Sequence, residues 1–213
     1  DNTVTCFLKD SKERIWIGTR NGLALFNPEN HRMISFKNDP KNIRSLSNNF
    51  IQKIIETPDH KLYIGTEGGG LNILDLKTLT FFDDLSSVTF DRILASETPD
   101  GLAGLSVQSV FQDSFGNIWA GGLGSGLNFI PAHENDFNKI RYLPYTGNTN
   151  SLNAKTVPGI CTDSKDRVWL ANGFGGIGIY KDGEKRRQIN SINNANITQN
   201  FMSVYKAHNN EII

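Results

Sequence analysis

The chain has 213 residues, 38% of them hydrophobic, so one large domain or two small ones with a sizeable core can form. Its 22 Lys and Arg residues balance its 22 Asp and Glu residues, which argues against a nucleic-acid-binding protein, because such proteins usually carry a basic excess or stripe. No apolar run approaches the roughly 18 residues of a membrane-spanning helix. The sequence shows no signal peptide and opens with Asp1 rather than Met, so we expect a processed protein or a segment of a longer one.

The first predicted elements are four short strands. The apolar segment from Val4 to Leu8 is rich in β-branched and aromatic residues, which favours a strand. A turn follows at "DSKER" (10–14), where the aspartate side chain can hydrogen-bond the turn backbone. "IWIG" (15–18) predicts the second strand, a glycine turn leads into a third, and "RMISF" (32–36) predicts a weaker fourth strand.

The same pattern returns three more times along the chain. Successive copies of its aromatic position are 47, 56 and 50 residues apart, and a leucine lies 17 residues before each of the last three aromatics. Later third strands are predicted at "LNILDL" (71–76) and "IGIYK" (177–181), and a later fourth strand at "LTFFDD" (79–84). The repeated positions are the aromatics Trp16, Tyr63, Trp119 and Trp169, the glycines Gly18, Gly65 and Gly121, and the leucines Leu46, Leu102 and Leu152.

These markers divide the chain into repeats that cover approximately 1–47, 48–103, 104–153 and 154–197, with a partial fifth at 198–213. Four short strands in roughly 50 residues, without helical periodicity, predict an all-β fold, a β-propeller built from four-stranded antiparallel blades. One such sheet cannot bury both of its faces alone, so neighbouring blades must stack on one another. We expect the recurring aromatic residues to fill the space between them.

The glycine-rich and acidic segments are expected to be structural. "GGLGSG" (121–126) leads into an apolar strand, whereas a phosphate-binding loop needs a helix after it. Asp10, Asp113 and Asp163 begin turns and have too few oxygen ligands beside them for calcium. The histidines show no metal-ligand spacing, and the first strands of the repeats lack the paired carboxylates of a glycosidase. We therefore predict no metal, no cofactor and no catalytic residue in this segment.

The two cysteines, Cys6 and Cys161, are too few for a disulfide framework in a chain of this length. We expect two small buried side chains. A disulfide between them in an oxidising compartment is the alternative.

Binding is expected on the segments that differ between repeats. In a propeller, the turn after the second strand and the link into the next blade emerge on the same face, and loops on a rigid scaffold commonly carry binding residues. Aromatic rings pack against the C–H surfaces of sugars, and planar polar side chains bind their hydroxyl groups. The candidate ligand-binding residues are Arg20, Arg44, Asn49, Glu67, Tyr142, Tyr145, Asn153 and Phe174. The alternative is that these side chains are only solvated.

The repeated motif resembles a known family. "D-x-x-G-x-x-W-I-G-T-x-x-G-G-L", followed by a variable segment and "S-L-x-x-N", is similar to the two-component regulator propeller repeat, and "RIWIGTRNGL" (14–23) and "KLYIGTEGGGL" (61–71) carry it best. The third and fourth copies have "AGG" and "LAN" in place of "IGT". Propellers of this family resemble seven-bladed rings, which need about 350 residues at this repeat length. The resemblance therefore implies that a chain of about four blades is a fragment of a larger propeller.

The resemblance implies a non-catalytic sensor module in the periplasm, on the outer part of an inner-membrane hybrid histidine kinase. It also implies an oligosaccharide ligand, whose binding signals across the membrane to the kinase. Such a segment has no nucleic-acid partner and reaches the membrane only through its full-length parent. One alternative is a propeller scaffold for protein–protein contact, or for self-association through propeller edges or as a dimer. A propeller lyase or glycosidase is a further, weaker alternative.

Overall fold

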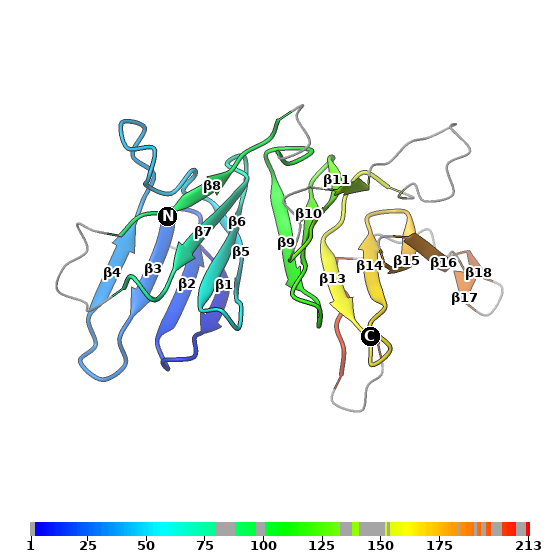
Figure 1. The fold of residues 1–213 in the computed structure, drawn as a ribbon, viewed down its shortest axis with the longest axis horizontal. Helices are drawn as coiled ribbons and strands as arrows, with labels where there is room; N and C mark the ends of the chain where they lie inside the picture. The colour runs from blue at the N-terminus through cyan, green and yellow to red at the C-terminus, as the bar shows by residue number, and fades with distance from the viewer. Residues whose placement is uncertain are drawn as a thin grey trace. The chain divides into compact units, whose positions relative to one another are not determined.

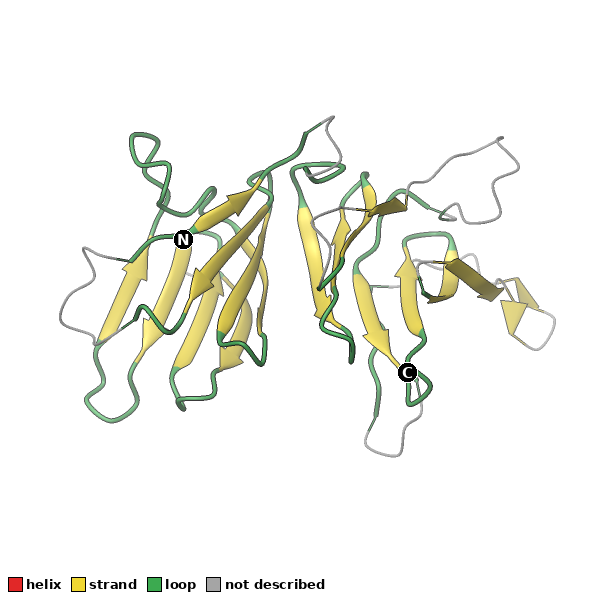
Figure 2. Ribbon diagram, in the orientation of Figure 1, coloured by secondary structure: helices red, strands yellow, loops and turns green. Residues whose placement is uncertain are grey.

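The computed structural model describes residues 3–79, 88–96, 101–132, 138–140, 152, 154–182, 184–189, 191–192, 195–196, 202–207 and 212–213. All regular secondary structure in these residues is β-strand (Figure 2). The strands form four four-stranded sheets and one hairpin, and within each sheet the strands lie side by side in chain order. This arrangement confirms the predicted all-β fold of four-stranded blades. The described part of the chain contains no helix with the length and apolar character needed to cross a membrane.

The chain divides into two compact units, residues 1–94 with 105–110 and residues 95–104 with 111–213. The first unit contains two antiparallel sheets (Figure 1). One sheet consists of β1 (Val4–Lys9), β2 (Ile15–Thr19), β3 (Gly22–Phe26) and β4 (Met33–Phe36). The other consists of β5 (Ile51–Glu56), β6 (Lys61–Thr66), β7 (Leu71–Asp75) and β8 (Asp91–Ile93).

The core of the first unit combines residues from both of its sheets. Burial alternates along β2, because successive side chains of a strand point to opposite faces of the sheet. Trp16 is fully buried, and its ring centroid lies 6.0 Å from that of Phe36. Ile54 on β5 and Leu62 on β6 are buried in the same cluster. The aromatic of the first repeat therefore packs in a core that both sheets share.

Glycine in the second strand lets the next repeat approach closely. A Cβ atom on Gly18 would lie 2.5 Å from Cys6 Sγ and 2.8 Å from Ile51 Cγ2. A Cβ atom on Gly65 would lie 2.7 Å from the carbonyl oxygen of Val107. All three distances are too short for a carbon atom, so these glycines are required by the close packing of successive repeats.

The second unit also contains two four-stranded sheets, together with a short hairpin. The strands of its first sheet are β9 (Val107–Gln112), whose first residues group with the first unit, β10 (Ile118–Gly122), β11 (Gly126–Ile130) and β12 (Asn138–Ile140). Its second sheet consists of β13 (Gly159–Thr162), β14 (Val168–Asn172), β15 (Gly176–Lys181) and β16 (Glu184–Ile189). The separate hairpin consists of β17 (Ser191–Ile192) and β18 (Ala195–Asn196). Trp119, Leu170 and Tyr180 are buried in one cluster of this unit.

One sequence prediction is corrected by the strand pairing. The fourth strand of the second sheet is β8, which pairs with β7, rather than "LTFFDD", of which residues 80–84 lie outside the described residues. Leu79 donates its N–H to the carbonyl of Leu76, as in a turn, so β7 is not followed directly by its partner. In the partial fifth repeat, the described residues form an isolated bridge between Lys206 and Ile212.

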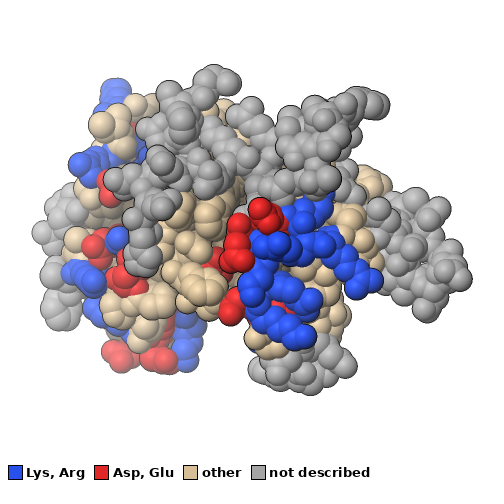
Figure 3. Space-filling model, turned by 45° about the vertical axis from the view of Figure 1, so that its right-hand side comes forward, with Lys and Arg blue, Asp and Glu red and all other residues tan. Residues whose placement is uncertain are grey.

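Charged side chains are unevenly distributed over the surface. On the face drawn in Figure 3, Lys and Arg side chains gather in one cluster, with Asp and Glu side chains beside it. The outer strand β16 carries charges of both signs, and Arg186 pairs with Glu184 at 3.1 Å and with Asp182 at 3.7 Å. Charged residues on an edge strand hinder its pairing with another chain. The neutral net charge of the chain therefore hides local charged regions.

Both cysteines are free thiols in the structure. Burial raises the pKa of the Cys161 thiol to about 11, and burial likewise raises the pKa of Cys6. A raised pKa disfavours the reactive thiolate. Both side chains therefore act as small packing groups.

Candidate functional site

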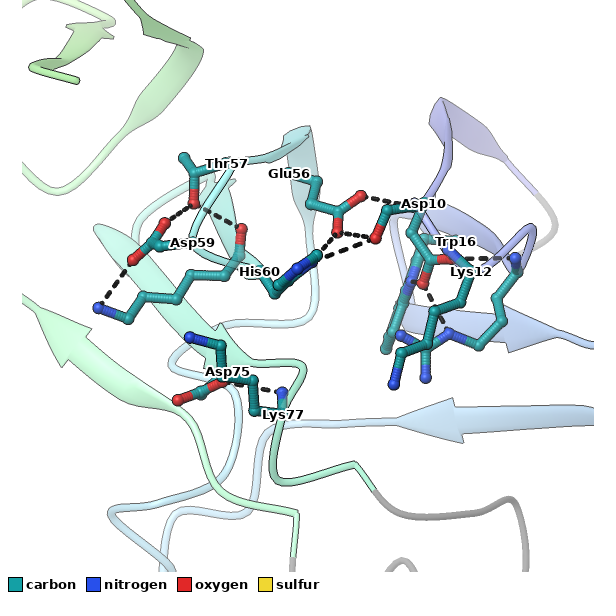
Figure 4. A network of polar contacts seen from close by, with 12 residues as sticks. Asp10, Lys12, Trp16, Glu56, Thr57, Asp59, His60, Asp75 and Lys77 are labelled. Carbon is teal, nitrogen blue, oxygen red and sulfur yellow. Dashed lines mark hydrogen bonds and ion pairs between the residues drawn. The ribbon is translucent and has the colours of Figure 1, made fainter. Parts of the chain in front are cut away.

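The turn of the first repeat is organised by a buried aspartate (Figure 4). Trp16 Nε1 donates a hydrogen bond to Asp10 Oδ2 at 2.9 Å, and Arg14 Nε donates to the same oxygen at 2.7 Å. Asp10 Oδ1 accepts the backbone N–H groups of Lys12 and Arg14 at 2.9 and 3.0 Å. The carboxylate therefore joins its own turn to the aromatic residue in the core.

The same arrangement occurs in the third and fourth repeats. Trp119 Nε1 donates to Asp113 Oδ2 at 2.9 Å, and Trp169 Nε1 donates to Asp163 Oδ2 at 2.8 Å. Burial of Asp163 opposes its ionisation, but hydrogen bonds from Trp169, Arg167 and Lys165 outweigh this and lower its pKa to about 2. Because hydrogen-bond donors already engage both oxygens of each carboxylate, these aspartates act as turn caps.

The second repeat departs from this arrangement at both positions. Thr57 stands where the other repeats have the aspartate, and Tyr63 stands where they have tryptophan. Thr57 Oγ1 lies 2.6 Å from Asp59 Oδ1 and 3.1 Å from the carbonyl oxygen of Lys61 (Figure 4). The two substitutions are linked, because a tyrosine ring has no N–H group that could donate a hydrogen bond to an aspartate at position 57.

A serine of the first turn contacts the first strand of the second sheet. Ser11 donates its N–H and its hydroxyl to the two carboxylate oxygens of Glu56, each at 2.6 Å, and Ser11 Oγ lies 3.3 Å from His60 Nδ1. His60 Nδ1 also lies 3.4 Å from Glu56 Oε1 (Figure 4). In a catalytic triad, the nucleophile and the acid bind opposite nitrogens of the imidazole. Here both approach Nδ1, so this cluster joins two turns and does not have triad geometry.

Three of the predicted ligand-binding residues meet around Phe50 in the first unit. The Arg20 guanidinium carbon lies 5.1 Å from the centre of the Phe50 ring, and Glu67 donates its N–H to the Phe50 carbonyl at 2.9 Å. Gln52 Nε2 donates to Glu67 Oε2 at 2.9 Å, and the Asn49 carbonyl accepts the N–H of Gly22 at 2.7 Å. We call Arg20, Asn49, Phe50, Gln52 and Glu67 the Phe50 cluster.

The local sequence explains how the Phe50 cluster forms. Arg20 lies in the β2–β3 turn and Glu67 in the β6–β7 turn, while Asn49 and Phe50 end the link that enters β5. The side-chain oxygen of Asn49 accepts the N–H of Asn38 at 2.7 Å, which fixes the end of this link. The cluster is therefore built from loops that rigid strands hold in place.

Arg44 does not join the Phe50 cluster through any contact that the structure shows. Its guanidinium forms an ion pair with Asp91 at 2.9 Å, and both side chains are largely exposed. Exposed ion pairs contribute little to stability, about 0–1 kcal/mol. This pair marks the meeting of the link with β8.

In the second unit, the structure describes one of the four candidate residues. Phe174 lies in the β14–β15 turn with its ring largely exposed and a backbone φ of 58°. Tyr142, Tyr145 and Asn153 lie outside the described residues.

Comparison with known proteins places the repeats in a family. The model of the family described as two component regulator propeller matches residues 1–21, 45–68 and 101–124. Each matched segment contains the first two strands of one sheet and the turn between them. These three segments match two-component regulator propeller repeats.

Among curated proteins, these propeller repeats are similar to part of histidine kinase P4 of Formosa agariphila. The two sequences are 27% identical over an alignment that covers 72% of this chain and 14% of the kinase. The chain therefore spans a small part of the length of its relative.

Solved propeller structures share the fold. One is the extracellular domain of a protein described as a hybrid two component system of B. thetaiotaomicron, with a TM-score of 0.72 and 20% identity over all of this chain and 26% of that domain. Another is PorZ, a surface component of the type-IX secretion system of Porphyromonas gingivalis, with a TM-score of 0.70 and 15% identity over 94% of this chain and 29% of PorZ. At these identities, the similarity establishes the fold.

Sequence reasoning missed two members of the Phe50 cluster and the partners of the repeated tryptophans. Phe50 could have been predicted as a binding residue, because it lies at the end of a variable link, directly after the candidate Asn49. The aspartate–tryptophan bond had a signal too, because the two residues recur six positions apart in three propeller repeats. Asp91 had no local signal, since it lies 47 residues beyond Arg44 and meets it only through the fold.

Proposed function

We propose that this chain is a sensor module of a two-component signalling protein and that it binds an oligosaccharide at the loop end of its sheets. Its repeats, its similarity to part of a histidine kinase and its likeness to extracellular domains of two-component systems support a sensor role. They also support a location in the periplasm, as the outer part of an inner-membrane protein. Ligand binding then changes the signal that reaches the kinase, and this module performs no catalytic step.

The observation that carries this proposal is the Phe50 cluster. It places a guanidinium group over an aromatic ring and, in the turn whose backbone bonds that aromatic residue, a carboxylate paired with an amide, on segments held by two sheets. Binding sites for small molecules combine such apolar surfaces with a few polar groups of fixed position. Carboxylate and amide oxygens accept hydrogen bonds from sugar hydroxyls, and the guanidinium group donates to their oxygens.

Isothermal titration calorimetry of the full chain against cello-, xylo-, laminari- and galacturonate tetrasaccharides tests this proposal. We expect one of them to bind, and we expect Arg20→Ala and Glu67→Gln to weaken that binding by about tenfold or more, which corresponds to about 1.4 kcal/mol. Arg186→Ala, which removes an exposed arginine from β16, is the control and should bind as the wild type does. If none of the four binds, the carbohydrate proposal fails.

A second candidate function, protein contact or self-association, is favoured by an exposed apolar strand. Val4 and Phe7 on β1 are 45% and 67% exposed, whereas Ile51 and Ile54, at the corresponding positions of β5, are 0% and 3% exposed. Sedimentation velocity of the full chain and of its Phe7→Gln variant measures whether the protein self-associates through β1. Self-association that Phe7→Gln abolishes supports this function, and a chain that stays monomeric at high concentration contradicts it.

A further inference from the structure

The β14–β15 turn departs from its counterparts in the second and third repeats at a strained position. Gly68 and Gly124 are the second residues after β6 and β10, with φ angles of 84° and 72°, and Phe174 occupies the same position after β14 with a φ of 58°. Side chains with a Cβ atom are disfavoured in this left-handed region. Burial does not compensate, because 75% of the Phe174 side chain is exposed. Backbone strain of this kind is found preferentially at functional sites.

Two buried amide oxygens next to the same turn lack hydrogen-bond partners. Asn172 is fully buried, and no described group bonds its Oδ1. Gln188 Oε1 is likewise buried and unpartnered, although its Nε2 donates to the Gly175 carbonyl at 2.7 Å. The two side chains meet at Gly178, since a Cβ atom there would lie 3.4 Å from both Asn172 Nδ2 and Gln188 Oε1. Buried polar atoms normally have partners, so this pair needs an explanation.

The first and second repeats have threonine at the position of Asn172, and each hydroxyl is hydrogen-bonded within its turn. Thr66 Oγ1 donates to the Gly70 carbonyl at 2.9 Å, and Thr19 Oγ1 donates to the Gly22 carbonyl at 2.8 Å. Asn172 makes the corresponding contact with its Nδ2, at 3.4 Å, and its Oδ1 remains spare.

The position of Gly178 is also filled differently elsewhere. Asn128 occupies the corresponding place in the third repeat, and its Oδ1 accepts the N–H of Ala103 at 2.7 Å. In the second repeat, Asn72 Oδ1 accepts the N–H of Ser47 at 2.9 Å. The fourth repeat therefore replaces three residues of one region in ways that leave amide oxygens unpaired beside an exposed aromatic ring.

We propose that the β14–β15 turn is a sugar-binding subsite. The ring of Phe174 stacks on the C–H face of a pyranose, and hydroxyl groups of the ligand donate hydrogen bonds to Asn172 Oδ1 and Gln188 Oε1. Gly173 and Gly175 flank Phe174, so the turn can rearrange to admit a hydroxyl group to these oxygens. This inference rests on the proposed function and specifies a polyhydroxylated, hydrogen-bond-donating ligand for the second unit.

The chain itself supplies the variants that test this proposal. Phe174→Gly and Asn172→Thr convert the turn toward that of the second repeat, which the fold already accommodates. Phe115→Ala is the matched control, because it removes another largely exposed phenylalanine from a different turn of the same unit. All are made in the full chain and titrated by calorimetry with the same four tetrasaccharides.

We expect both turn variants to bind about tenfold or more weakly than the wild type. Phe174→Gly should unfold at the same temperature as the wild type or up to about 4 °C higher, because it relieves the strained φ angle. A structural role for Phe174 predicts the opposite, a lower unfolding temperature with unchanged affinity, and that result would overturn the inference.

The remaining outcomes separate this inference from the proposed function. If a tetrasaccharide binds the wild type, Phe174→Gly and Asn172→Thr equally, the subsite is wrong and the sensor proposal stands. If Phe115→Ala weakens binding as much as Phe174→Gly does, the effect is not specific to this turn and the subsite is also wrong. If none of the tetrasaccharides binds the wild type, both proposals fail.

Discussion

At three of its turns, the chain places a carboxylate between the backbone of the turn and the indole of a tryptophan six residues later. Asp10 and Asp163 are buried, and Asp113 is half-buried. A buried carboxylate is stable only when hydrogen bonds replace its lost hydration. Each of these aspartates receives bonds from the backbone and from two side chains. The short acidic turns therefore fix the repeated tryptophans in place.

The lowered pKa of Asp163 predicts a stability that depends on pH. Because its pKa of about 2 lies below the usual 3.8, the ionised form stabilises the fold fully above about pH 4, and this contribution is lost as the pH falls toward 2. We expect Asp163→Asn to lower the free energy of unfolding by about 1–2 kcal/mol at pH 6 and by clearly less at pH 3. Urea unfolding of both proteins at the two pH values measures this. An equal difference at both would show that the carboxylate charge contributes nothing.

Trp119 predicts a large effect of truncation. Trp119→Ala removes a buried ring, leaves Asp113 Oδ2 without the indole donor, and should destabilise the fold by about 3–5 kcal/mol. The control Phe115→Ala removes an exposed ring and should change stability by less than about 0.5 kcal/mol. Chemical denaturation compares the two, and a loss below 1 kcal/mol for Trp119→Ala would contradict its role in packing.

At the scale of the strand, the sequence was most informative where the repeat is regular. Strand order followed from the hydrophobic pattern and the recurring turns, because each sheet is built from consecutive segments with local contacts. The fourth strand of the second sheet was predicted too early. β8 contains two charged residues, Asp91 and Arg92, and Arg92 donates a hydrogen bond to the carbonyl of Ser45, 47 residues away. Such distant contacts leave no local pattern in the sequence.

The glycines of the second strand yield a prediction at the same scale. Gly18→Ala should destabilise the first unit by about 1–3 kcal/mol, because the added methyl group overlaps Cys6 and Ile51. The fourth repeat carries Ala171 at the corresponding position, buried and accommodated. Ala171→Gly is therefore the control, with a loss of about 1 kcal/mol or less. Thermal unfolding compares the variants, and an unchanged midpoint for Gly18→Ala would show that the strands can separate at no cost.

At the scale of the whole molecule, the residues that repeat build the fold, and the residues that do not repeat are the candidates for binding. Composition and spacing were sufficient to predict the class of fold, because the same pattern of strands and turns is present in every repeat. The candidate site was only partly predictable. Arg20, Asn49 and Glu67 were chosen for their residue types on loops, but their meeting at Phe50 depends on how two sheets present those loops.

Hydrogen–deuterium exchange tests most directly whether the repeated residues build the fold and the non-repeated residues bind the ligand. The chain is compared with and without whichever of the four tetrasaccharides binds it in calorimetry. We predict that the ligand slows exchange at the loops that carry Arg20, Phe50 and Glu67 and at residues 172–176, and leaves the aspartate turns, such as 113–117, unchanged. Protection centred on the aspartate turns, or no protection at either loop region, would contradict the account.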